Sequence, residues 1–237
     1  MKIIKTNNKL IKLTLLLFIL IKPFSSFAQD NTLSKEEVAE GWELLFNGID
    51  MSQWRNFKKH DLSDKWQIAN GTMQLSGKGG GDILTEAIYQ NFDLRLEWKI
   101  SLAGNSGIFI LADEAGKQIY SHAVEVQILD NLRHADNKIA SHLSGSIYDM
   151  IASPSESHRP AGLWNQVRIF LNNKHLQVWQ NNVQTVDIVI GSGQWNTLVD
   201  ESKFKDWEGF ALSNVGHIGL QDHGDIVSFK NIKIKAL

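Results

Sequence analysis

The segment from Val124 to Asp130 (Val-Glu-Val-Gln-Ile-Leu-Asp) carries the polar residues that point most directly to chemistry. Its aliphatic and β-branched residues predict a strand, and because successive side chains of a strand point to opposite faces, Glu125 and Gln127 share one face. Burying a polar group without a partner costs on the order of a few kcal/mol, so such a pair in an apolar strand is typical of a binding or catalytic surface. The alternative is that Glu125 lies on a solvated outer face.

Histidines in polar stretches could add metal ligands or proton carriers beside this strand. They are His122, His134, His142, His158, His217 and His223. His134 lies in the loop directly after the Glu125 strand, and His223 lies in a Gln-Asp-His-Gly turn. Histidine and carboxylate groups together bind divalent metals or share general acid–base catalysis. The spacing matches no closed zinc motif, so a surface or hydrogen-bonding role is the simpler interpretation for any one of them.

We predict that side chains from separate stretches of the chain converge on one pocket in the concave face of a sheet. They are Glu125, Gln127, His134, His142, Tyr148 and His223. Tyr148 would donate a proton to a leaving oxygen, and the alternative is a packed core tyrosine. Gly104-Asn-Ser-Gly107 is expected to link two strands and to present polar groups at the rim, and a plain Gly-rich turn is the alternative. The predicted substrate-binding set is Asn105, Ser106, Gln127, Asp130, Trp164 and Gln221.

Short strands separated by Asn and Gly turns must position these residues. Phe92 to Ile100 alternates strictly between apolar and polar residues, as half-buried strands do. Trp66 to Leu75 contains Asn70-Gly71, a strong hairpin signal. Because no helical periodicity appears after residue 41, the pattern predicts an all-β domain of two antiparallel sheets stacked as a sandwich, with one short helix at residues 34–40. Further strands are predicted at 107–111, 124–129, 166–171, 175–179, 183–190, 217–220 and 226–234.

The first 28 residues have the three-part layout of a secretory signal peptide. Lys2 and Lys5 give a basic start, Leu13 to Ile21 is a short apolar run, and Ala28 offers a cleavage site. The run is shorter than the roughly 20 residues that a spanning helix needs, so no membrane anchor is expected. We therefore expect a signal peptide at 1–28, a lead-in at 29–40, one domain at 41–237, and a periplasmic or secreted protein.

Composition narrows the classes of partner and cofactor. The chain has no cysteine, so it can form neither disulfides nor thiolate metal sites, and lipid attachment to cysteine is excluded. Its net charge is −2 and it has no basic run, so nucleic acid is not an expected partner. The Gly-rich run at 77–81 is not followed by a helix, which argues against a phosphate-binding loop. No organic cofactor is expected.

Several motifs, in order along the chain, resemble the 3-keto-disaccharide hydrolase family. They lie at 41–48, 104–108, 125–131, 164–165, 202–204, 217–224 and 229–232. The resemblance runs from about residue 41 to 237 and implies a concanavalin A-like jelly-roll sandwich with a concave sugar-binding face. It also implies action on 3-keto-glycosides, which a partner sugar 3-dehydrogenase would supply. Members of the family are associated with cleavage by elimination and some with one divalent metal.

The residues suit this chemistry better than ordinary glycosidase chemistry. A retaining or inverting glycosidase needs two carboxylates across the scissile bond, whereas the Glu125 face offers one carboxylate and the amide of Gln127. A 3-ketone acidifies the C2 proton, so a single base can start the elimination of the C1 substituent, and a metal or His donors can stabilise the enolate. The predicted catalytic residues are Glu125, His223 and Tyr148.

A divalent metal held by some of these residues is the accompanying expectation. The candidate ligands are Glu125, His134, His142 and His223. Glu125 would be a poorer base as a ligand, so its two roles compete. The main alternative to an enzyme is a non-catalytic, lectin-like carbohydrate-binding module, which the same fold supports. A structural or adhesion role comes third.

Overall fold

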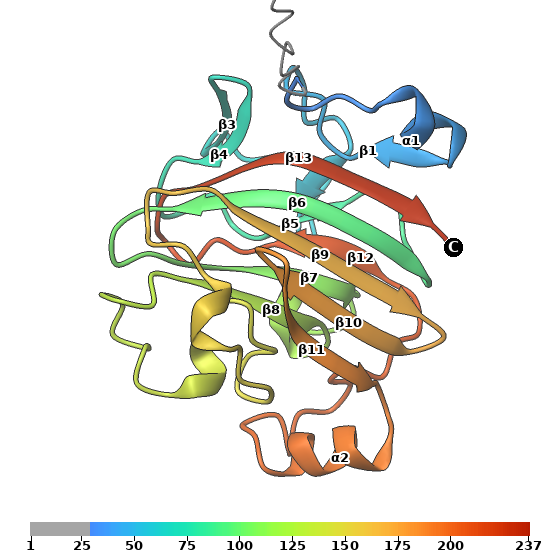
Figure 1. Cartoon of the computed structure of the whole chain (residues 1–237), viewed down its shortest axis with the longest axis vertical. Helices are drawn as coiled ribbons and strands as arrows, with labels where there is room; N and C mark the ends of the chain where they lie inside the picture. The colour runs from blue at the N-terminus through green and yellow to red at the C-terminus, as the bar shows by residue number, and fades with distance from the viewer. Residues whose placement is uncertain (1–28) are drawn as a thin grey trace, which may run out of the picture.

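The computed structural model describes residues 29–237, so the predicted signal peptide lies outside the described residues. The strands form two stacked sheets of eight and five strands (Figure 1). Every strand pair within them is antiparallel. The predicted all-β sandwich of two antiparallel sheets is confirmed.

The eight-stranded sheet runs in the order β11-β10-β9-β6-β13-β4-β3, and β1 pairs with β13. Its strands are β1 (Trp42–Leu44), β3 (Trp66–Ala69), β4 (Thr72–Leu75), β6 (Phe92–Ile100), β9 (Asn165–Asn172), β10 (His175–Gln180), β11 (Val183–Val189) and β13 (Val227–Ala236). The predicted hairpin joins β3 to β4 through Asn70 and Gly71, whose φ angles are +52° and +71°. Asn and Gly adopt this left-handed conformation more readily than other residues, which is why the turn forms there.

The five-stranded sheet carries the Glu125 segment and runs in the order β2-β5-β12-β7-β8. Its strands are β2 (Trp54–Asn56), β5 (Ile83–Thr85), β7 (Asn105–Ala112), β8 (Val124–Leu129) and β12 (His217–Leu220). On β8, Val124, Val126 and Ile128 belong to the core between the sheets. Glu125 and Gln127 alternate with them and therefore point to the outer face of this sheet.

The predicted turn at 104–107 is wrong in its position. Gly104 closes the turn after β6, where its N–H donates to the Ser101 carbonyl at 3.1 Å. Asn105 to Gly107 already belong to β7 and pair with β8. The turn lies earlier, and Ala103, with a φ of +55°, takes its left-handed position.

One of the two α-helices was predicted from the sequence and the other was not. The short helix α1 (Lys35–Ala39) lies where it was predicted, with a capping box between Ser34 and Glu37. A second helix, α2 (Gly193–Asp200), was not predicted; it is too short for periodicity to show, and Ser192 caps it by accepting the Trp195 N–H. Within residues 29–237 no helix is long and apolar enough to cross a membrane. Single 3₁₀ turns are η1 (Ile119–Ser121), η2 (Ala140–His142) and η3 (Ser155–Ser157).

Candidate active site

Glu125 lies on the outer face of β8, and its carboxyl reaches over the neighbouring strand β7. The residue is only 9% exposed. A Cβ atom built on Gly107 would lie 2.4 Å from Glu125 Oε1, a distance that two unbonded atoms do not adopt. Gly107 therefore makes room for the carboxyl, and any larger residue there would displace it.

The Glu125 carboxyl has little polar stabilisation. Among the described residues its one side-chain hydrogen bond comes from Gln221 Nε2, which donates to Oε1 at 3.2 Å. Burial raises the pKa of Glu125 to about 8; the charge of Lys203 opposes this rise, and the charges of Asp82 and Asp136 add to it. At pH 7 the protonated form dominates, and the ionised form is a stronger base than an ordinary carboxylate.

A second carboxyl, Asp82, lies on the same face of the sheet. It directly precedes β5, where Ile83 points into the core, so Asp82 points outward. Asp82 Oδ1 accepts the Asp222 N–H at 2.9 Å. Burial raises the pKa of Asp82 to about 6; the Asp222 N–H opposes the rise and the Asp222 charge adds to it. Sequence analysis missed this residue because one Asp after a Gly-rich run carries no pattern of its own.

A cation, Lys203, accompanies the two carboxyls. Lys203 Nζ lies 4.0 Å from the centre of the Tyr148 ring, and the Lys203 N–H donates to Asp149 Oδ2 at 2.7 Å. Desolvation lowers the pKa of Lys203, and the negative charges of Glu125, Asp149 and Asp136 oppose that change. Lys203 lies in one of the motifs that carry the family resemblance, but its charged, polar surroundings in sequence gave no reason to assign it a role.

His142 is the centre of a hydrogen-bonded network. Its Nδ1 lies 2.8 Å from Asp136 Oδ1, and its Nε2 lies 2.8 Å from Asp149 Oδ1. Tyr148 Oη donates to Asp136 Oδ2 at 2.9 Å, and its ring stacks on His142 with centroids 4.3 Å apart. Burial raises the pKa of Tyr148, and the bond to Asp136 adds to the rise. Tyr148 is therefore a weaker acid than an ordinary tyrosine, and its hydroxyl proton is engaged by Asp136.

Tyr148 also extends the sheet beside Glu125. Ile147 forms an isolated antiparallel bridge with Val126, and the Tyr148 N–H donates to the Glu125 carbonyl at 3.1 Å. Residues that face each other across such a pair project from the same face of a sheet. The loop after β8 thus adds one short strand segment to the site.

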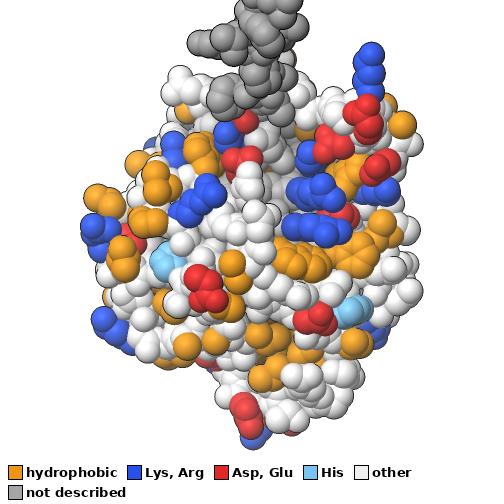
Figure 2. Space-filling model, viewed as in Figure 1, with side chains coloured by type: hydrophobic (Ala, Val, Ile, Leu, Met, Phe, Trp, Pro, Cys, Tyr) orange, Lys and Arg blue, Asp and Glu red, His pale blue; other side chains and the backbone are white. Residues whose placement is uncertain are grey.

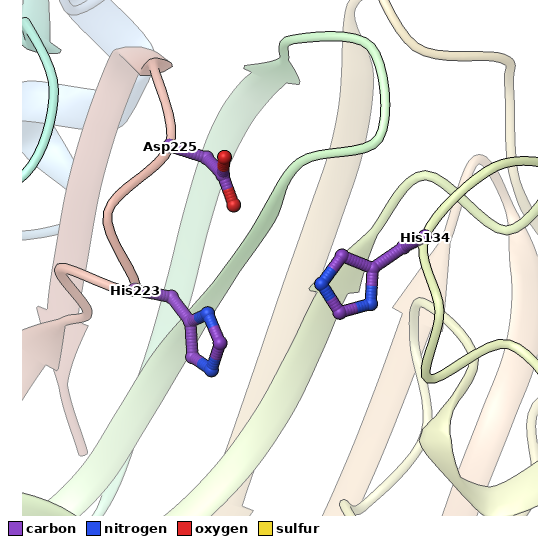
Figure 3. A group of neighbouring side chains, drawn as sticks. All are labelled: His134, His223 and Asp225. Carbon is purple, nitrogen blue, oxygen red and sulfur yellow. The ribbon is translucent and has the colours of Figure 1, made fainter.

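His134, His223 and Asp225 form the group that fits the predicted metal best (Figure 3). One ligand atom of each lies within 4.8 Å of the others, and the Asn105 N–H donates to Asp225 Oδ2 at 3.0 Å. Imidazole and carboxylate ligands suit ions such as Zn²⁺. His134 Nδ1 accepts the Asp136 N–H at 3.1 Å. Because a neutral imidazole accepts at one nitrogen only, ligation through Nε2 would release that bond.

This group changes the predicted set of ligands. His134 and His223 remain and Asp225 joins them. His142 drops out because both of its ring nitrogens already contact carboxylates. Glu125 lies outside the group, and its carboxyl accepts a hydrogen bond from Gln221 instead. The arrangement favours Glu125 as a proton acceptor over Glu125 as a ligand.

Two amide oxygens on this face lack partners. Gln127 Nε2 donates to Asn105 Oδ1 at 3.1 Å, but Gln127 Oε1 is buried and accepts no hydrogen bond from residues 29–237. The same holds for Gln221 Oε1. An unpartnered buried acceptor costs about 1–3 kcal/mol, so a hydrogen-bond donor brought to either oxygen would stabilise it. The predicted substrate contacts of Asn105, Gln127 and Gln221 are compatible with this geometry.

Ser106 and Asp130 were predicted to contact substrate, but their side chains are committed to the backbone. Ser106 is fully buried, and its Oγ donates to the Gln221 carbonyl at 2.9 Å. Asp130 accepts the Ala103 N–H at 2.8 Å and the Leu132 N–H at 3.1 Å. Both residues hold the ends of β7 and β8 in place and do not reach a ligand.

Trp164 was also predicted to bind substrate, and the structure places it on the other sheet. Its ring lies 4.8 Å from Lys99 Nζ and 4.9 Å from Lys230 Nζ. These lysines belong to β6 and β13 of the eight-stranded sheet, where they alternate with core residues and face outward. Trp164 is therefore on the opposite side of the sandwich from Glu125.

Comparison with known proteins supports the family resemblance. Residues 41–235 match the family described as the 3-keto-alpha-glucoside-1,2-lyase-like domain. This chain belongs to that family. A 3-keto-disaccharide hydrolase from Bacteroides thetaiotaomicron is 34% identical to it in an alignment 241 positions long, which covers 89% of this chain and 83% of the relative.

Solved structures superpose on this chain and agree with its fold. A candidate glycosyl hydrolase from Parabacteroides distasonis superposes with a TM-score of 0.83 at 30% identity, covering 88% of this chain and 100% of that one. A Bacillus subtilis protein with a galectin-like fold has a TM-score of 0.51 at 9% identity, covering 88% of this chain and 94% of that one. The second likeness concerns the fold alone, and it agrees with the jelly-roll architecture.

Proposed function

We propose that this chain cleaves the glycosidic bond of 3-keto-glycosides by removing the C2 proton. Membership of the 3-keto-alpha-glucoside-1,2-lyase-like family and the 34% identity to a 3-keto-disaccharide hydrolase support an enzyme that hydrolyses carbohydrates. The 3-keto substrate and the elimination route are proposed beyond what these comparisons support.

The carboxyl of Glu125 carries the proposal. It is buried beside Gly107, has Gln221 as its side-chain hydrogen-bond donor, and has a pKa raised to about 8. A general base is most effective when its pKa lies near the working pH, and the raised pKa of Glu125 makes it a stronger base than an ordinary carboxylate. A nucleophilic carboxylate of a retaining glycosidase would instead need to be ionised at neutral pH.

The steps balance as a hydrolysis. Ionised Glu125 takes the C2 proton, the electron pair forms the enolate of the 3-ketone, and the enolate then expels the oxygen at C1. The leaving oxygen takes a proton from the Lys203 ammonium group, whose lowered pKa makes it a better acid than an ordinary lysine. Water then adds to C1 and gives its released proton to the neutral Lys203 amine, and Glu125 delivers to C2 a proton that has exchanged with solvent, which restores both groups. The buried oxygens of Gln127 and Gln221 would accept hydrogen bonds from sugar hydroxyls.

Deuterium tests the route. In deuterated water, elimination followed by addition should place deuterium at C2 of the released 3-keto sugar, read by NMR or mass spectrometry. Direct hydrolysis would leave C2 unlabelled and would overturn the proposal. The matching glycoside without the ketone is the control; it should not be cleaved, because its C2 proton is not acidic.

We also propose one divalent ion at His134, His223 and Asp225, where it would supply positive charge that stabilises an enolate. His223→Ala should lose bound metal, measured by elemental analysis, and at least about tenfold in activity. His175→Ala is the control, because His175 pairs with Asp187 on the other sheet. A metal-free protein with full activity would remove the ion from the proposal.

A second candidate function rests on Asp82. Glu125 and Asp82 are two carboxyls with pKa values near 8 and 6, and a pair with separated pKa values is the arrangement of a general acid and its partner base or nucleophile. Asp82 thus adds a second carboxyl to the face on which the sequence predicted only Glu125. Direct hydrolysis by the pair should cleave glycosides without a ketone and should leave C2 unlabelled.

The non-catalytic alternative and the cellular setting have their own tests. A lectin-like module would bind sugars, measured by calorimetry, without turnover of any 3-keto-glycoside. We further propose a periplasmic or secreted location from the N-terminal segment, and a sugar 3-dehydrogenase as the source of the ketone. Cell fractionation with N-terminal sequencing, and deletion of the dehydrogenase, test these two points.

A further inference from the structure

A pocket of about 500 Å³ lies between residues 115–122 and the segment that carries Trp207 and Glu208. The proton chemistry proposed above makes no use of it. We propose that this pocket binds the leaving-group sugar of a 3-keto-disaccharide, so that the enzyme holds both rings of its substrate. This inference rests on the proposed function, because it takes the oxidised ring to lie at Glu125.

Two aromatic side chains make the platform of the pocket. The Tyr120 and Trp207 rings lie 5.9 Å apart at an angle of 42°. Tyr120 is 39% exposed and Trp207 is partly buried. Aromatic rings of this kind present a broad apolar surface with a polar edge, and the C–H face of a pyranose packs against such a surface.

The platform adjoins the catalytic groups through Lys203. Lys203 Nζ lies 5.6 Å from the centre of the Trp207 ring and 4.0 Å from that of Tyr148. Tyr148 in turn bonds the backbone of Glu125 at 3.1 Å. A glycosidic oxygen beside Lys203 would therefore have one ring on the Glu125 side and the other on the Trp207 side. This is the order that proton donation by Lys203 to the leaving oxygen requires.

The two walls of the pocket are tied to each other. The Ala211 N–H, from the segment after Trp207, donates to the His122 carbonyl at 2.8 Å, and on its own side His122 Nδ1 lies 2.8 Å from Asp113 Oδ1. A Cβ atom on Gly209, whose φ is +88°, would lie 2.5 Å from His122 Nε2. The glycine thus permits close packing of one wall against the other, and a site held in this way loses little conformational entropy on binding.

The rim of the pocket suits an uncharged ligand. Lys117 and Glu208 contribute one charge of each sign, and Ser121 contributes a hydroxyl. The rim therefore offers both donors and acceptors without a net charge. Sugar hydroxyls need both kinds of group, whereas an anionic ligand would need an excess of cations. The volume also lies in the range of about 300–1,000 Å³ that is usual for small-molecule sites.

Kinetics on two substrates test the assignment. Tyr120→Ala and Trp207→Ala should each raise KM about tenfold for a 3-keto-disaccharide, as the loss of an aromatic stacking surface predicts. Both should leave KM for a methyl 3-keto-glycoside, which has no second ring, within about twofold. Tyr120→Phe keeps the ring and should behave as the wild type. Trp164→Ala, on the opposite sheet, is the matched tryptophan control and should change neither KM. Equal losses on both substrates, or no loss on the disaccharide, would overturn the subsite.

A binding measurement separates this test from the test of the proposed function. Calorimetry with the unoxidised disaccharide and the Glu125→Gln protein measures affinity without any turnover. Adding Tyr120→Ala should weaken that affinity about tenfold. If this loss of affinity were seen but 3-keto-glycosides were not cleaved, the subsite assignment would be supported and the proposed reaction would be rejected. If the affinity did not change, the subsite assignment would be rejected, whether or not the enzyme cleaves 3-keto-glycosides.

Discussion

The outer faces of the two sheets both carry charged side chains, but they stabilise them differently. On the eight-stranded sheet, Asp93 is buried, and Arg168 donates to both of its oxygens at 2.9 Å, while Arg95 adds a third bond at 3.1 Å. On the five-stranded sheet, Glu125 is equally hidden and has the amide of Gln221 as its side-chain donor. A paired carboxylate serves the fold, whereas an unpaired one is held in a state that chemistry can use.

The two faces also differ in their hollows. Over the eight-stranded sheet, a groove of about 990 Å³ runs between the segment at 29–37 and the strands, past Arg95, Arg168 and Trp179. Figure 2 shows this face, where basic side chains lie beside hydrophobic ones. The Glu125 face has a smaller pocket next to it, of about 500 Å³. The larger hollow therefore lies on the face whose buried carboxylate is paired with arginine, and the carboxyl proposed as the base lies on the other face.

The largest effect should follow from removing the unpaired carboxyl. Glu125→Gln should lower kcat about 10²- to 10⁴-fold, the usual contribution of a general base. Its melting temperature should not fall, because the change removes a group that is costly to bury. Steady-state kinetics and thermal unfolding check both parts. A variant with near-normal kcat would show that the Glu125 carboxyl is not the catalytic base.

A smaller loss should come from crowding the carboxyl without removing it. Gly107→Ala places a Cβ atom 2.4 Å from Glu125 Oε1, so the carboxyl must move, and overpacking of this kind typically costs about 1–3 kcal/mol of stability. We expect kcat to fall about 100-fold, as misplacement of a catalytic group does. Gly193→Ala is the control, because nothing lies within 4 Å of its Cβ position. Equal activity of the two variants would contradict the close approach.

Activity and stability should both depend on pH through the ionisation of Glu125. With a pKa of about 8 for Glu125, the ionised fraction, and with it kcat/KM, should rise about tenfold between pH 7 and pH 9. Stability should change in the opposite direction. The pKa is raised above its ordinary value of 4.5, so the folded chain keeps a proton that the unfolded chain releases. The stability present below pH 4.5 is therefore lost as the pH rises toward 8.

Urea unfolding at pH 5 and pH 8 checks this direction. The wild type should lose free energy of unfolding relative to Glu125→Gln over that interval, because the glutamine has no proton to release. Parallel curves for the two proteins would mean that the folded chain does not hold the pKa of Glu125 above its ordinary value.

The smallest effect on activity should come from a change on the eight-stranded sheet, where Asp93 is paired with arginine. Arg168→Ala removes two hydrogen bonds from buried Asp93 and should cost about 1–3 kcal/mol of stability. The activity should stay within about twofold, because Arg168 lies on the other side of the sandwich. Arg168→Lys should recover part of the stability. A large loss of activity with normal stability would mean that the groove takes part in the reaction.

Much of the fold could be predicted because the signal is local. Strict alternation in 92–100 and Asn-Gly at 70–71 each act through the backbone nearby, and both elements form as predicted. Alternation also put Glu125 and Gln127 on one face. Helix α2 was not predicted, because its eight residues contain one buried residue, Trp195, and follow one N-terminal cap, which leave no periodic pattern.

The rest of the site depends on contacts between distant segments. Asp82 and Lys203 are 121 positions apart in the numbering of the chain, and only the folded sheet and its loops bring both near Glu125. The predicted substrate contact of Ser106 is not compatible with the structure. The face that a residue occupies depends on the register of its strand, and Gly107 rather than Ser106 lies beside Gln127. Trp164 failed because an aromatic residue in a family motif does not reveal which sheet it covers.

The bridge between Ile147 and Val126 has a consequence beyond catalysis. β8 is the last named strand of its sheet, and an uncovered outer strand can recruit a strand from another molecule and start aggregation. The Tyr148 N–H and the Gln127 N–H, which donates to the Ser146 carbonyl at 3.0 Å, occupy part of this border. The loop that brings Tyr148 to the proposed base thus also covers part of the border of β8 and limits its pairing with a strand of a second molecule.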